Sequence, residues 1–376
     1  MTTPRVVVIG SGVAGASTAF ALAAAGMDVV VVDHVLSGQA TAAGAGIIAP
    51  WTSTSDGPAY ELSAAGASYY PTLLDRLRAL GITDVGYRTA GALVVHADRA
   101  RLDAVEQRLR QRTAGVAIAG SLERLDERQA RTLFPPLARN LQAVHVSGGA
   151  RVDGRRLRSG LLAGAQRLGA ALVDAAARLT PTAAGTWAVH TSDAEIGADI
   201  VVVSCGAWVN SVFKPLGYQL AVEPQRGQLA HLVLGGSDTG NWPAVLPLAS
   251  HYIVPFDAGR IVVGATRETG SGFDARVTAG GMLEVLGNAL SVAPGLAEAS
   301  VIETRVGLRP LATRQTPYVG PVEGLANLFV NTGFGATGLT MGPVAGEALA
   351  QLILTGSSHL DLSAFAPPAL SQARHG

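Results

Sequence analysis

A short apolar run that opens into a glycine-rich turn dominates the start of this sequence. Residues 5–10, "RVVVIG", hold β-branched residues with no polar alternation, which is typical of a parallel strand buried on both faces. The stretch Gly10-Ser-Gly12-Val-Ala-Gly15 fits the pattern G-x-G-x-x-G, and an alanine-rich helical segment follows it. A second apolar run, "MDVVVVDH", reaches Asp33. This strand–turn–helix–strand–acid unit predicts a dinucleotide-binding site.

Each residue of this unit has a physical role. Gly10 permits the tight turn, Gly12 lets the backbone approach a pyrophosphate, and Gly15 allows helix and strand to pack closely. The N-terminus of the helix offers free N–H groups and the positive end of its dipole. Asp33 can accept hydrogen bonds from ribose hydroxyls, whereas His34 either covers the adenine edge or lies exposed. The predicted cofactor contacts of the unit are Gly10, Ser11, Gly12, Val13, Ala14, Gly15, Asp33 and His34.

The composition bounds the class of protein. The 376 residues are 48% hydrophobic and 15% charged, which indicates a folded chain with room for two domains. The formal net charge of zero gives no electrostatic reason to expect nucleic acid or another polyanion as a partner. Cys205 is the only cysteine, so the sequence excludes an intrachain disulfide, and no metal site is expected. With neither a signal peptide nor a membrane-spanning run, we expect a cytoplasmic protein, and peripheral membrane contact stays open.

Later segments continue an α/β pattern. Residues 37–51, "SGQATAAGAGIIAPW", form either a flexible loop or, as the apolar "GIIAPW" favours, a backbone that lies against a flat ligand. Residues 151–173 predict a turn, an amphipathic helix and a strand, and residues 251–268 predict a hairpin. Cys205 is placed inside an apolar strand as a packed core thiol. Residues 327–354 predict a strand, a second glycine-rich turn and a helix.

Six segments, taken in their order along the chain, resemble one family. They are "VVVIGSGVAGASTAFALAAAGMDVVVVD", "GAGIIAP", "ADIVVVSCGAWVNSV", "YIVPFDAGRIVVGATRE", "GLRP…TPYVGP" and "NTGFGATGLTMGP". Together they resemble the D-amino-acid oxidase family of FAD-dependent oxidoreductases, above all its bacterial glycine oxidase and D-amino-acid dehydrogenase branch. The resemblance implies an α/β fold in which a Rossmann-type FAD-binding domain is interleaved with a substrate domain built on a mixed, largely antiparallel β-sheet. It assigns residues 1–85, 145–217 and 300–376 to the FAD-binding domain and residues 86–144 and 218–299 to the substrate-binding domain.

The resemblance also carries over the contacts of the cofactor, which it implies to be FAD. The loop that contains "ATAAGAGII" would wrap the pyrophosphate and the isoalloxazine edge, and the late glycine-rich turn would line the pyrimidine end of the ring. Arg178 matches a position that contacts adenine through its backbone. The implied contacts beyond the N-terminal unit are Thr41, Ala42, Ala43, Gly46, Ile47, Arg178, Gly206, Trp208, Ala336, Thr337, Gly338, Leu339 and Thr340. Because no cysteine lies in the late catalytic segment, we expect FAD to be bound non-covalently.

The stretch "GLRP" raises the question of what Arg309 holds in an apolar segment. From the residues alone, a salt bridge to an acid such as Glu303 or Glu323 explains Arg309 as well as a ligand does. The resemblance implies that Arg309 pairs with a substrate carboxylate, which suits a guanidinium fork, and that Tyr252 assists. Tyr252 also fits a packed strand residue with a satisfied hydroxyl. Weaker candidates for substrate contact are His251 and Trp51.

The activity implied by the resemblance is oxidative deamination of a small amino acid, either a D-α-amino acid or a glycine-like compound. Hydride transfer from Cα to flavin N5 would give an imine that hydrolyses to the oxo acid. Two alternatives stay open. One is an oxidase or dehydrogenase of a secondary amine, such as an N-methyl or cyclic imino acid, and the other is a non-catalytic dinucleotide-binding protein. The electron acceptor would be oxygen or a quinone, and the chain could form a homo-oligomer.

Overall fold

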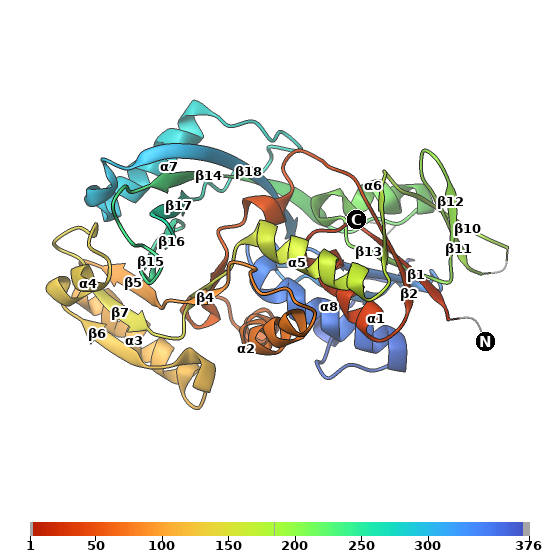
Figure 1. Ribbon diagram of the computed structural model, residues 1–376, viewed down its shortest axis with the longest axis horizontal. Helices are drawn as coiled ribbons and strands as arrows, with labels where there is room; N and C mark the ends of the chain where they lie inside the picture. The colour runs from red at the N-terminus through yellow and green to blue at the C-terminus, as the bar shows by residue number, and fades with distance from the viewer. Residues whose placement is uncertain (1–2, 184, 371–376) are drawn as a thin grey trace.

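The computed structural model describes residues 3–183 and 185–370, which form two lobes side by side (Figure 1). A six-stranded sheet organises the lobe at the right of the view, and an eight-stranded sheet organises the lobe at the left. The chain passes between the lobes several times, so neither lobe is continuous in sequence. This is the interleaved α/β architecture that the family resemblance implies.

The six-stranded sheet is built around the N-terminal unit. Its strands in spatial order are β19 (Tyr318–Pro321), β20 (Leu328–Thr332), β13 (Ile200–Val203), β1 (Arg5–Ile9), β2 (Asp28–Asp33) and β9 (Ala171–Asp174). All neighbouring pairs are parallel except β19 with β20. In β1, Val6 and Val8 pack into the core beneath the helices, whereas Val7 and Ile9 pack into the core of the opposite face. Burial on both faces explains why this strand has no polar alternation.

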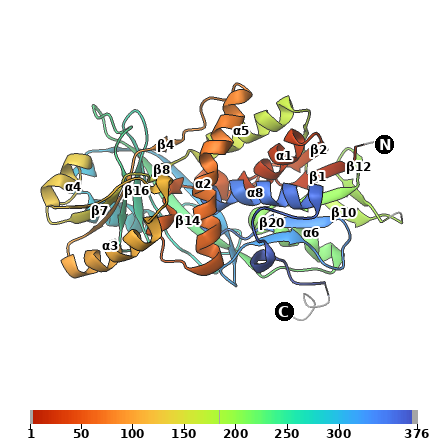
Figure 2. The same cartoon turned by 90° about the horizontal axis from the view of Figure 1, so that it is seen from below.

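Helices cover one face of this sheet, and a small sheet covers the other. Helix α1 (Val13–Ala24) packs against both α5 (Gly154–Arg167) and α8 (Gly338–Thr355), and α2 (Gly57–Ala79) packs against α8. Figure 2 shows α2 crossing the middle of the molecule beside α8. The opposite core is closed by β10 (Arg178–Pro181), β11 (Trp187–His190), β12 (Glu195–Ala198) and α6 (Val209–Phe213). Within residues 3–183 and 185–370, no helix has the length and apolar character needed to cross a membrane.

The eight-stranded sheet is mixed and largely antiparallel, as predicted. Its strands in spatial order are β18 (Ser300–Ala312), β14 (Val222–Val233), β17 (Arg260–Gly264), β16 (Tyr252–Pro255), β15 (Ala244–Pro247), β5 (Ala92–His96), β7 (Gln142–Val146) and β6 (Leu122–Leu125). Its one parallel pair is β15 with β5.

Three helices cover the outer parts of this sheet. Helices α7 (Ala279–Val292) and α4 (Glu127–Leu133) share one core with it, and α3 (Arg99–Thr113) packs against β5, β6 and β7. On the face of the sheet opposite α7 and α4, Leu229 and Val254 pack with Ala45 of the first lobe. This inner face of β14, β17 and β16 therefore meets the nucleotide-binding lobe.

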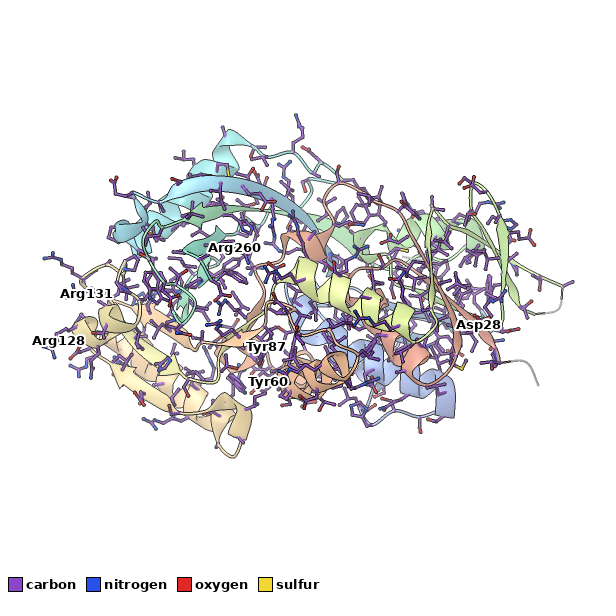
Figure 3. The ribbon with its side chains drawn as sticks, viewed as in Figure 1. Asp28, Tyr60, Tyr87, Arg128, Arg131 and Arg260 are labelled. Atoms are coloured by element: carbon purple, nitrogen blue, oxygen red, sulfur yellow. The ribbon has the colours of Figure 1, made fainter. Side chains whose placement is uncertain are left out.

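A fourth sheet, of three short strands, and an ion pair lie at the junction of the lobes. The sheet contains β3 (Ile47–Ile48), β8 (Ala150–Arg151) and β4 (Arg88–Thr89). Arg260 of β17, labelled in Figure 3, pairs with Asp153 at the start of α5, with 2.9 Å between Nη2 and Oδ2. A charged pair of this kind fixes the position of β17 relative to α5.

The structure corrects one expected domain boundary. The family resemblance assigns residues 300–376 to the FAD-binding domain, but β18 belongs to the eight-stranded sheet. It pairs with β14 along its whole length, from Ser300 opposite Val233 to Ala312 opposite Val222. The first thirteen residues of that expected segment therefore form part of the substrate lobe. The cause is a long strand pairing, which no local sequence pattern reveals.

Candidate active site

A cavity of about 760 Å³ lies where the two lobes meet. The first lobe contributes the turn after β1, the end of β2, the loop after β13 and the start of α8. The second lobe contributes parts of β14, β16 and β18 and the segment after β17. Volumes of this size are typical of small-molecule and cofactor sites, which commonly lie between domains. The described residues contain no group of three or more His, Cys, Asp or Glu side chains that could hold a metal ion.

Two glycines make the turn after β1 compact. Gly10 has a φ of 96°, and a Cβ there would lie 2.6 Å from the Ser204 carbonyl oxygen. A Cβ on Gly15 would collide with the Gly10 carbonyl oxygen, so helix and strand can pack this closely only without a side chain there. Gly12 is the N-cap of α1 and lines the cavity, and as a glycine it has no side chain to cap the helix. The positive end of the α1 dipole is therefore available to an anionic group in the cavity.

Asp33 organises the cavity wall at the end of β2. Its carboxylate accepts hydrogen bonds from the Ser11 backbone nitrogen at 3.0 Å and from the Ser11 hydroxyl. Arg158 of α5 donates to the Ser11 carbonyl oxygen at 2.7 Å, and its Nη2 lies 3.6 Å from Asp33 Oδ2. No sequence pattern marks Arg158, because the packing of α5 on α1 brings it to the turn. This guanidinium places positive charge beside the turn, where a pyrophosphate is expected.

Residues 40–47 form a wall of the cavity rather than a free loop. Every residue of this stretch lines the cavity. Thr41 Oγ1 accepts a hydrogen bond from the Val13 backbone nitrogen at 3.0 Å, which ties the stretch to the start of α1. Thr340 at the start of α8 donates to the Ile47 carbonyl oxygen at 3.1 Å. These two hydrogen bonds hold the backbone of this stretch of small residues beside the cavity.

Two paired glycines in the eight-stranded sheet let other groups of the site approach the sheet closely. Gly307 of β18 lies opposite Gly227 of β14. A Cβ on Gly307 would lie 2.9 Å from the Ala43 Cβ, so this glycine lets the wall approach the sheet. A Cβ on Gly227 would lie 2.5 Å from Cζ of Arg309. Gly227 therefore leaves the space that the Arg309 guanidinium occupies.

Arg309 extends from β18 across β14. Its Nη1 donates to the Thr266 carbonyl oxygen at 3.0 Å and to Gln225 Oε1 at 3.4 Å. Within the described part of the chain, no Asp or Glu forms an ion pair with Arg309, and Glu303 pairs instead with Arg305 at 2.6 Å. Burial lowers the pKa of Arg309, but the ordinary value is so high that the guanidinium keeps its charge. A half-buried cation with only neutral protein partners requires an anion from elsewhere.

Tyr252 of β16 lies near the same end of the cavity. Its hydroxyl oxygen would lie 3.2 Å from a Cβ built on Gly264 of the neighbouring strand. Burial raises the pKa of the Tyr252 phenol, while the charges of Arg309 and Arg267 act in the opposite direction. The phenol is therefore neutral at physiological pH and can donate a hydrogen bond to a ligand that Arg309 binds. Arg267, which the sequence analysis does not single out, also lines the cavity.

Most of the predicted contact residues line this one cavity. They are Gly10, Ser11, Gly12, Val13, Ala14, Asp33, His34, Thr41, Ala42, Ala43, Gly46, Ile47, Gly206, Trp208, Tyr252, Arg309, Ala336, Gly338, Leu339 and Thr340. The predicted residues outside its lining are Gly15, Trp51, Arg178, His251 and Thr337. Thus the structure places Arg309 and Tyr252, which both belong to the second lobe, in the same cavity as the predicted nucleotide turn of the first lobe.

The residues outside the lining have packing roles or lie one position away. Trp51 is 1% exposed and belongs to the core under α3, so it does not face a substrate. His251 is adjacent to both Ser250 and Tyr252, which do line the cavity, but its Nε2 is buried without a hydrogen-bond partner. Residues 175–177 line the cavity, whereas Arg178 begins β10 just beyond it. Which of these neighbouring residues lines the cavity depends on where the strand begins, and sequence patterns locate strand ends poorly.

Cys205 lies beyond the end of β13 at Val203, rather than inside the strand as predicted. It lines the cavity, and its thiol donates to the Ile9 carbonyl oxygen at 3.3 Å. Burial raises the pKa of this thiol, so the reactive thiolate is disfavoured. The thiol is therefore not set up as a nucleophile.

Residues 5–352 match the family described as FAD dependent oxidoreductase, or DAO. The chain belongs to this family. The uncharacterized oxidoreductase YurR of Bacillus subtilis (strain 168) is 44% identical over 363 residues, which cover 96% of this chain and 98% of YurR. The glycine oxidase of Pseudomonas aeruginosa is 32% identical over 376 residues, with 96% and 98% covered. The crystal structure of iminodiacetate oxidase (IdaA) from Chelativorans sp. BNC1 has a TM-score of 0.94 and 46% identity, and the match covers 96% of this chain and 99% of that one.

The cofactor of this DAO-family oxidoreductase is FAD, and the cavity suits it. The turn after β1 has no Cβ at Gly12, which lines the cavity, so the backbone leaves room there for a pyrophosphate. The N-terminus of α1 would supply positive potential to the same place, and Asp33 would offer carboxylate oxygens to ribose hydroxyls. The glycine-rich turn before α8 reaches the part of the cavity that also holds Arg309. The residues present therefore fit both ends of a flavin dinucleotide.

Proposed function

We propose that this enzyme oxidises the carbon–nitrogen bond of an amino acid that contains a glycine unit, N–CH2–COO⁻, and that Arg309 binds the carboxylate. The observation that carries the proposal is the Arg309 guanidinium, which lines the cavity and, among the described residues, donates only to the neutral oxygens of Thr266 and Gln225. A carboxylate offers such a guanidinium two parallel, charge-assisted hydrogen bonds. The neutral phenol of Tyr252 would donate a further hydrogen bond to the same group.

The relatives support the choice of a glycine unit. Glycine oxidase and iminodiacetate oxidase are both similar to this chain, and the compounds in their names share N–CH2–COO⁻. The glycine-like compound and the secondary amine, which the sequence leaves as alternatives, thus fall into one substrate class. D-α-Amino acids and cyclic imino acids lie outside this class because their Cα carries a substituent.

The proposed reaction removes two electrons and two hydrogens from the substrate. The carbon of the glycine unit loses a hydride, and the nitrogen loses a proton to solvent, which leaves a carbon–nitrogen double bond. Bound FAD supplies the acceptor for the two electrons. Water then splits the imine into glyoxylate and the remaining amine, which is ammonia when the substrate is glycine.

The protein side chains position the substrate rather than act as a base. Arg309 and Tyr252 would fix the carboxylate, which would also fix the orientation of the adjacent carbon. Cavity-lining acids within the described residues are limited to Asp33, which lies at the nucleotide end. Deprotonation of the substrate ammonium is therefore left to solvent, so turnover should rise as pH approaches the pKa of the substrate amine.

An anaerobic substrate screen tests the proposal. Holoenzyme is mixed under nitrogen with glycine, sarcosine, iminodiacetate, D-alanine or D-proline, and the loss of flavin absorbance is followed. We expect the three glycine-unit amines to bleach the flavin and to release glyoxylate. Sarcosine is the most informative of them, because attack on its glycine carbon gives glyoxylate and methylamine, whereas attack on its methyl group gives formaldehyde and glycine. Formaldehyde as the product, or bleaching only by amines with a substituted Cα, would refute the proposal.

A further inference from the structure

A second guanidinium, that of Arg267, faces the same end of the cavity as Arg309. Arg267 lines the cavity and is exposed. In the described ranges the side chain of Arg267 forms no hydrogen bond or ion pair, whereas other arginines there, such as Arg226 and Arg305, pair with an acid. An arginine in free solvent needs no partner, but an arginine that lines a substrate cavity presents a positive charge to any ligand that binds there.

The backbone alternation after β17 directs Arg267 into the cavity. The side chains on either side of it, Thr266 and Glu268, bond to each other at 2.6 Å between Thr266 Oγ1 and Glu268 Oε1. Glu268 also pairs with Arg226 at 2.6 Å and accepts from Gln228 Nε2 at 2.7 Å. These bonds lie on the face of the sheet that α7 covers, since Gln228 also bonds to Thr278 at the start of that helix. Because extended residues alternate between faces, Arg267 points to the opposite, cavity-facing side.

Strand pairing sets the place of Arg267 relative to Arg309. Arg226 of β14 forms an antiparallel bridge with Glu268. In antiparallel pairing the residue after Arg226 lies opposite the residue before Glu268, so Gly227 lies opposite Arg267. The Arg309 guanidinium lies over that same Gly227, having come from β18 on its other side. The two arginines therefore approach one glycine from opposite directions. Consistent with this, the charge of Arg267 contributes to lowering the pKa of Arg309, after the effect of burial.

The charge balance of the cavity leaves both arginines without an acid. Asp33 is the one Asp or Glu among the described residues that line the cavity. It stands at the nucleotide end, where it bonds to Ser11 and pairs with Arg158. Two guanidinium groups beside one glycine repel each other until anions bind between or upon them. One carboxylate forms a bidentate pair with one guanidinium, so a second carboxylate can bind the other guanidinium.

We infer that Arg267 is a specificity-determining residue that binds a second carboxylate of the substrate. The inference rests on the proposed function, in which Arg309 holds the carboxylate of the glycine unit. Because the carbon of that unit bears no substituent, the second carboxylate belongs to the group on nitrogen. The substrate class is then a secondary amine that carries an acid group on each side of its nitrogen, and such a molecule spans the two arginines.

A matched pair of substrates tests this inference. Iminodiacetate and sarcosine differ only by the second carboxylate, so the ratio of their kcat/KM values reports what that group contributes. We expect wild-type holoenzyme to prefer iminodiacetate by about ten- to hundredfold, the range of one charge-assisted contact. Arg267→Leu should lower this ratio toward one, and Arg267→Lys should restore part of it. Arg276→Leu is the control, since Arg276 lies in the same segment but pairs with Asp274 outside the cavity lining, and it should keep the wild-type ratio.

A binding measurement separates failure of the inference from failure of the proposed function. Diglycolate and methoxyacetate copy iminodiacetate and sarcosine with an ether oxygen in place of nitrogen. We expect calorimetry of the holoenzyme to show tighter binding of diglycolate, with the difference lost in Arg267→Leu. If no amine bleaches the flavin but this difference is found, the proposed function fails and the second carboxylate site stands. Three results would each overturn the inference. The first is equal binding of the two ethers, and the second is an unchanged ratio of the iminodiacetate and sarcosine kcat/KM values in Arg267→Leu. The third is a wild-type holoenzyme that prefers D-aspartate to iminodiacetate.

Discussion

The guanidinium group of Arg309 lies over the backbone of Gly227 on the neighbouring strand, and a Cβ at that glycine would come 2.5 Å from Arg309 Cζ. No side chain fits there unless the guanidinium moves. A glycine inside a strand weakens a sheet, so this position gives up local stability to make room for the arginine. The relationship links the sheet directly to the part of the cavity where a carboxylate is proposed to bind.

Gly227→Ala should therefore impair catalysis through Arg309. The added methyl group displaces the guanidinium from the Thr266 carbonyl oxygen, its partner at 3.0 Å. We expect kcat/KM for sarcosine to fall by about ten- to hundredfold, the cost of one charge-assisted hydrogen-bonded contact, while FAD stays bound. Steady-state kinetics and the flavin-to-protein absorbance ratio check both parts.

Gly280→Ala is the matched control for this change. A Cβ on Gly280, in the first turn of α7, meets no atom within 4 Å. Because alanine has the higher helix propensity, this variant should be as stable as the wild type or slightly more so, with unchanged kinetics. If both alanine variants lose activity to the same extent, the effect of Gly227→Ala is general and does not act through Arg309.

Asp33→Ala should weaken the binding of FAD. The carboxylate stands at the nucleotide end of the cavity, where it holds Ser11 and faces Arg158. Loss of a charged acceptor costs about 1.5–3 kcal/mol, so we expect the Kd of FAD to rise by about ten- to hundredfold. Titration of the apoprotein with FAD, followed by flavin fluorescence, measures this directly.

The same strand supplies the control for Asp33→Ala. Asp28, labelled in Figure 3, begins β2 at the other end and pairs with Arg5 at 2.7 Å. Asp28→Ala should leave FAD affinity unchanged. An Asp33→Ala variant that binds FAD as tightly as Asp28→Ala would show that Asp33 is no ligand of the cofactor.

His231 should make the enzyme less stable at mildly acidic pH. Its side chain is 2% exposed, and burial together with the charge of Arg305 lowers its pKa to about 4. The unfolded chain, with a histidine pKa of about 6.5, binds the proton more readily, so the free energy of unfolding falls as pH drops from about 6.5 towards 4. At pH 5 the loss amounts to about 2 kcal/mol relative to pH 7, since one pKa unit corresponds to about 1.4 kcal/mol.

His231→Leu removes this titration and provides the measurement. The variant should lose less stability than the wild type between pH 7 and pH 5, as judged by urea unfolding at each pH. Glu303, whose pKa the neighbouring Arg305 holds at about 2, stays ionised over this range and so does not contribute to the difference. The exposed His359 serves as the control position, and His359→Leu should follow the wild-type pH dependence. Parallel curves for all three proteins would mean that His231 does not titrate as described.

The nucleotide end of the site could be predicted from sequence because its determinants are local. The turn from Gly10 to Gly15 and the acid at Asp33 lie within one strand–helix–strand unit, and the cavity is lined by nearly all of it. Cys205 shows the limit of such local patterns. The strand β13 ends at Val203, two residues before Cys205, so Cys205 lies in the cavity wall rather than inside the strand. An apolar run predicts that a strand exists better than it predicts where the strand ends.

The substrate end depends on pairings that are distant in sequence. The place of Arg309 follows from the register of β18 on β14, and that of Arg267 follows from the bridge between Arg226 and Glu268. The resemblance to a known family pointed to Arg309 because its motif is specific. Arg267 stands in the segment "YIVPFDAGRIVVGATRE", which also carries the resemblance, but nothing in that segment assigns it a role, so only the folded sheet shows that it meets Arg309 over Gly227.

The most direct test of the account compares sarcosine with its methyl ester in wild-type enzyme and in Arg309→Leu, through the rate of anaerobic flavin bleaching. The ester keeps the amine and the glycine carbon but removes the charge that Arg309 is proposed to bind. We expect the wild type to prefer the acid by about ten- to hundredfold and Arg309→Leu to lose that preference, because a contact that is already absent cannot be lost twice. An acid preference of the same size in both proteins would contradict the account, since the carboxylate would then be recognised without Arg309.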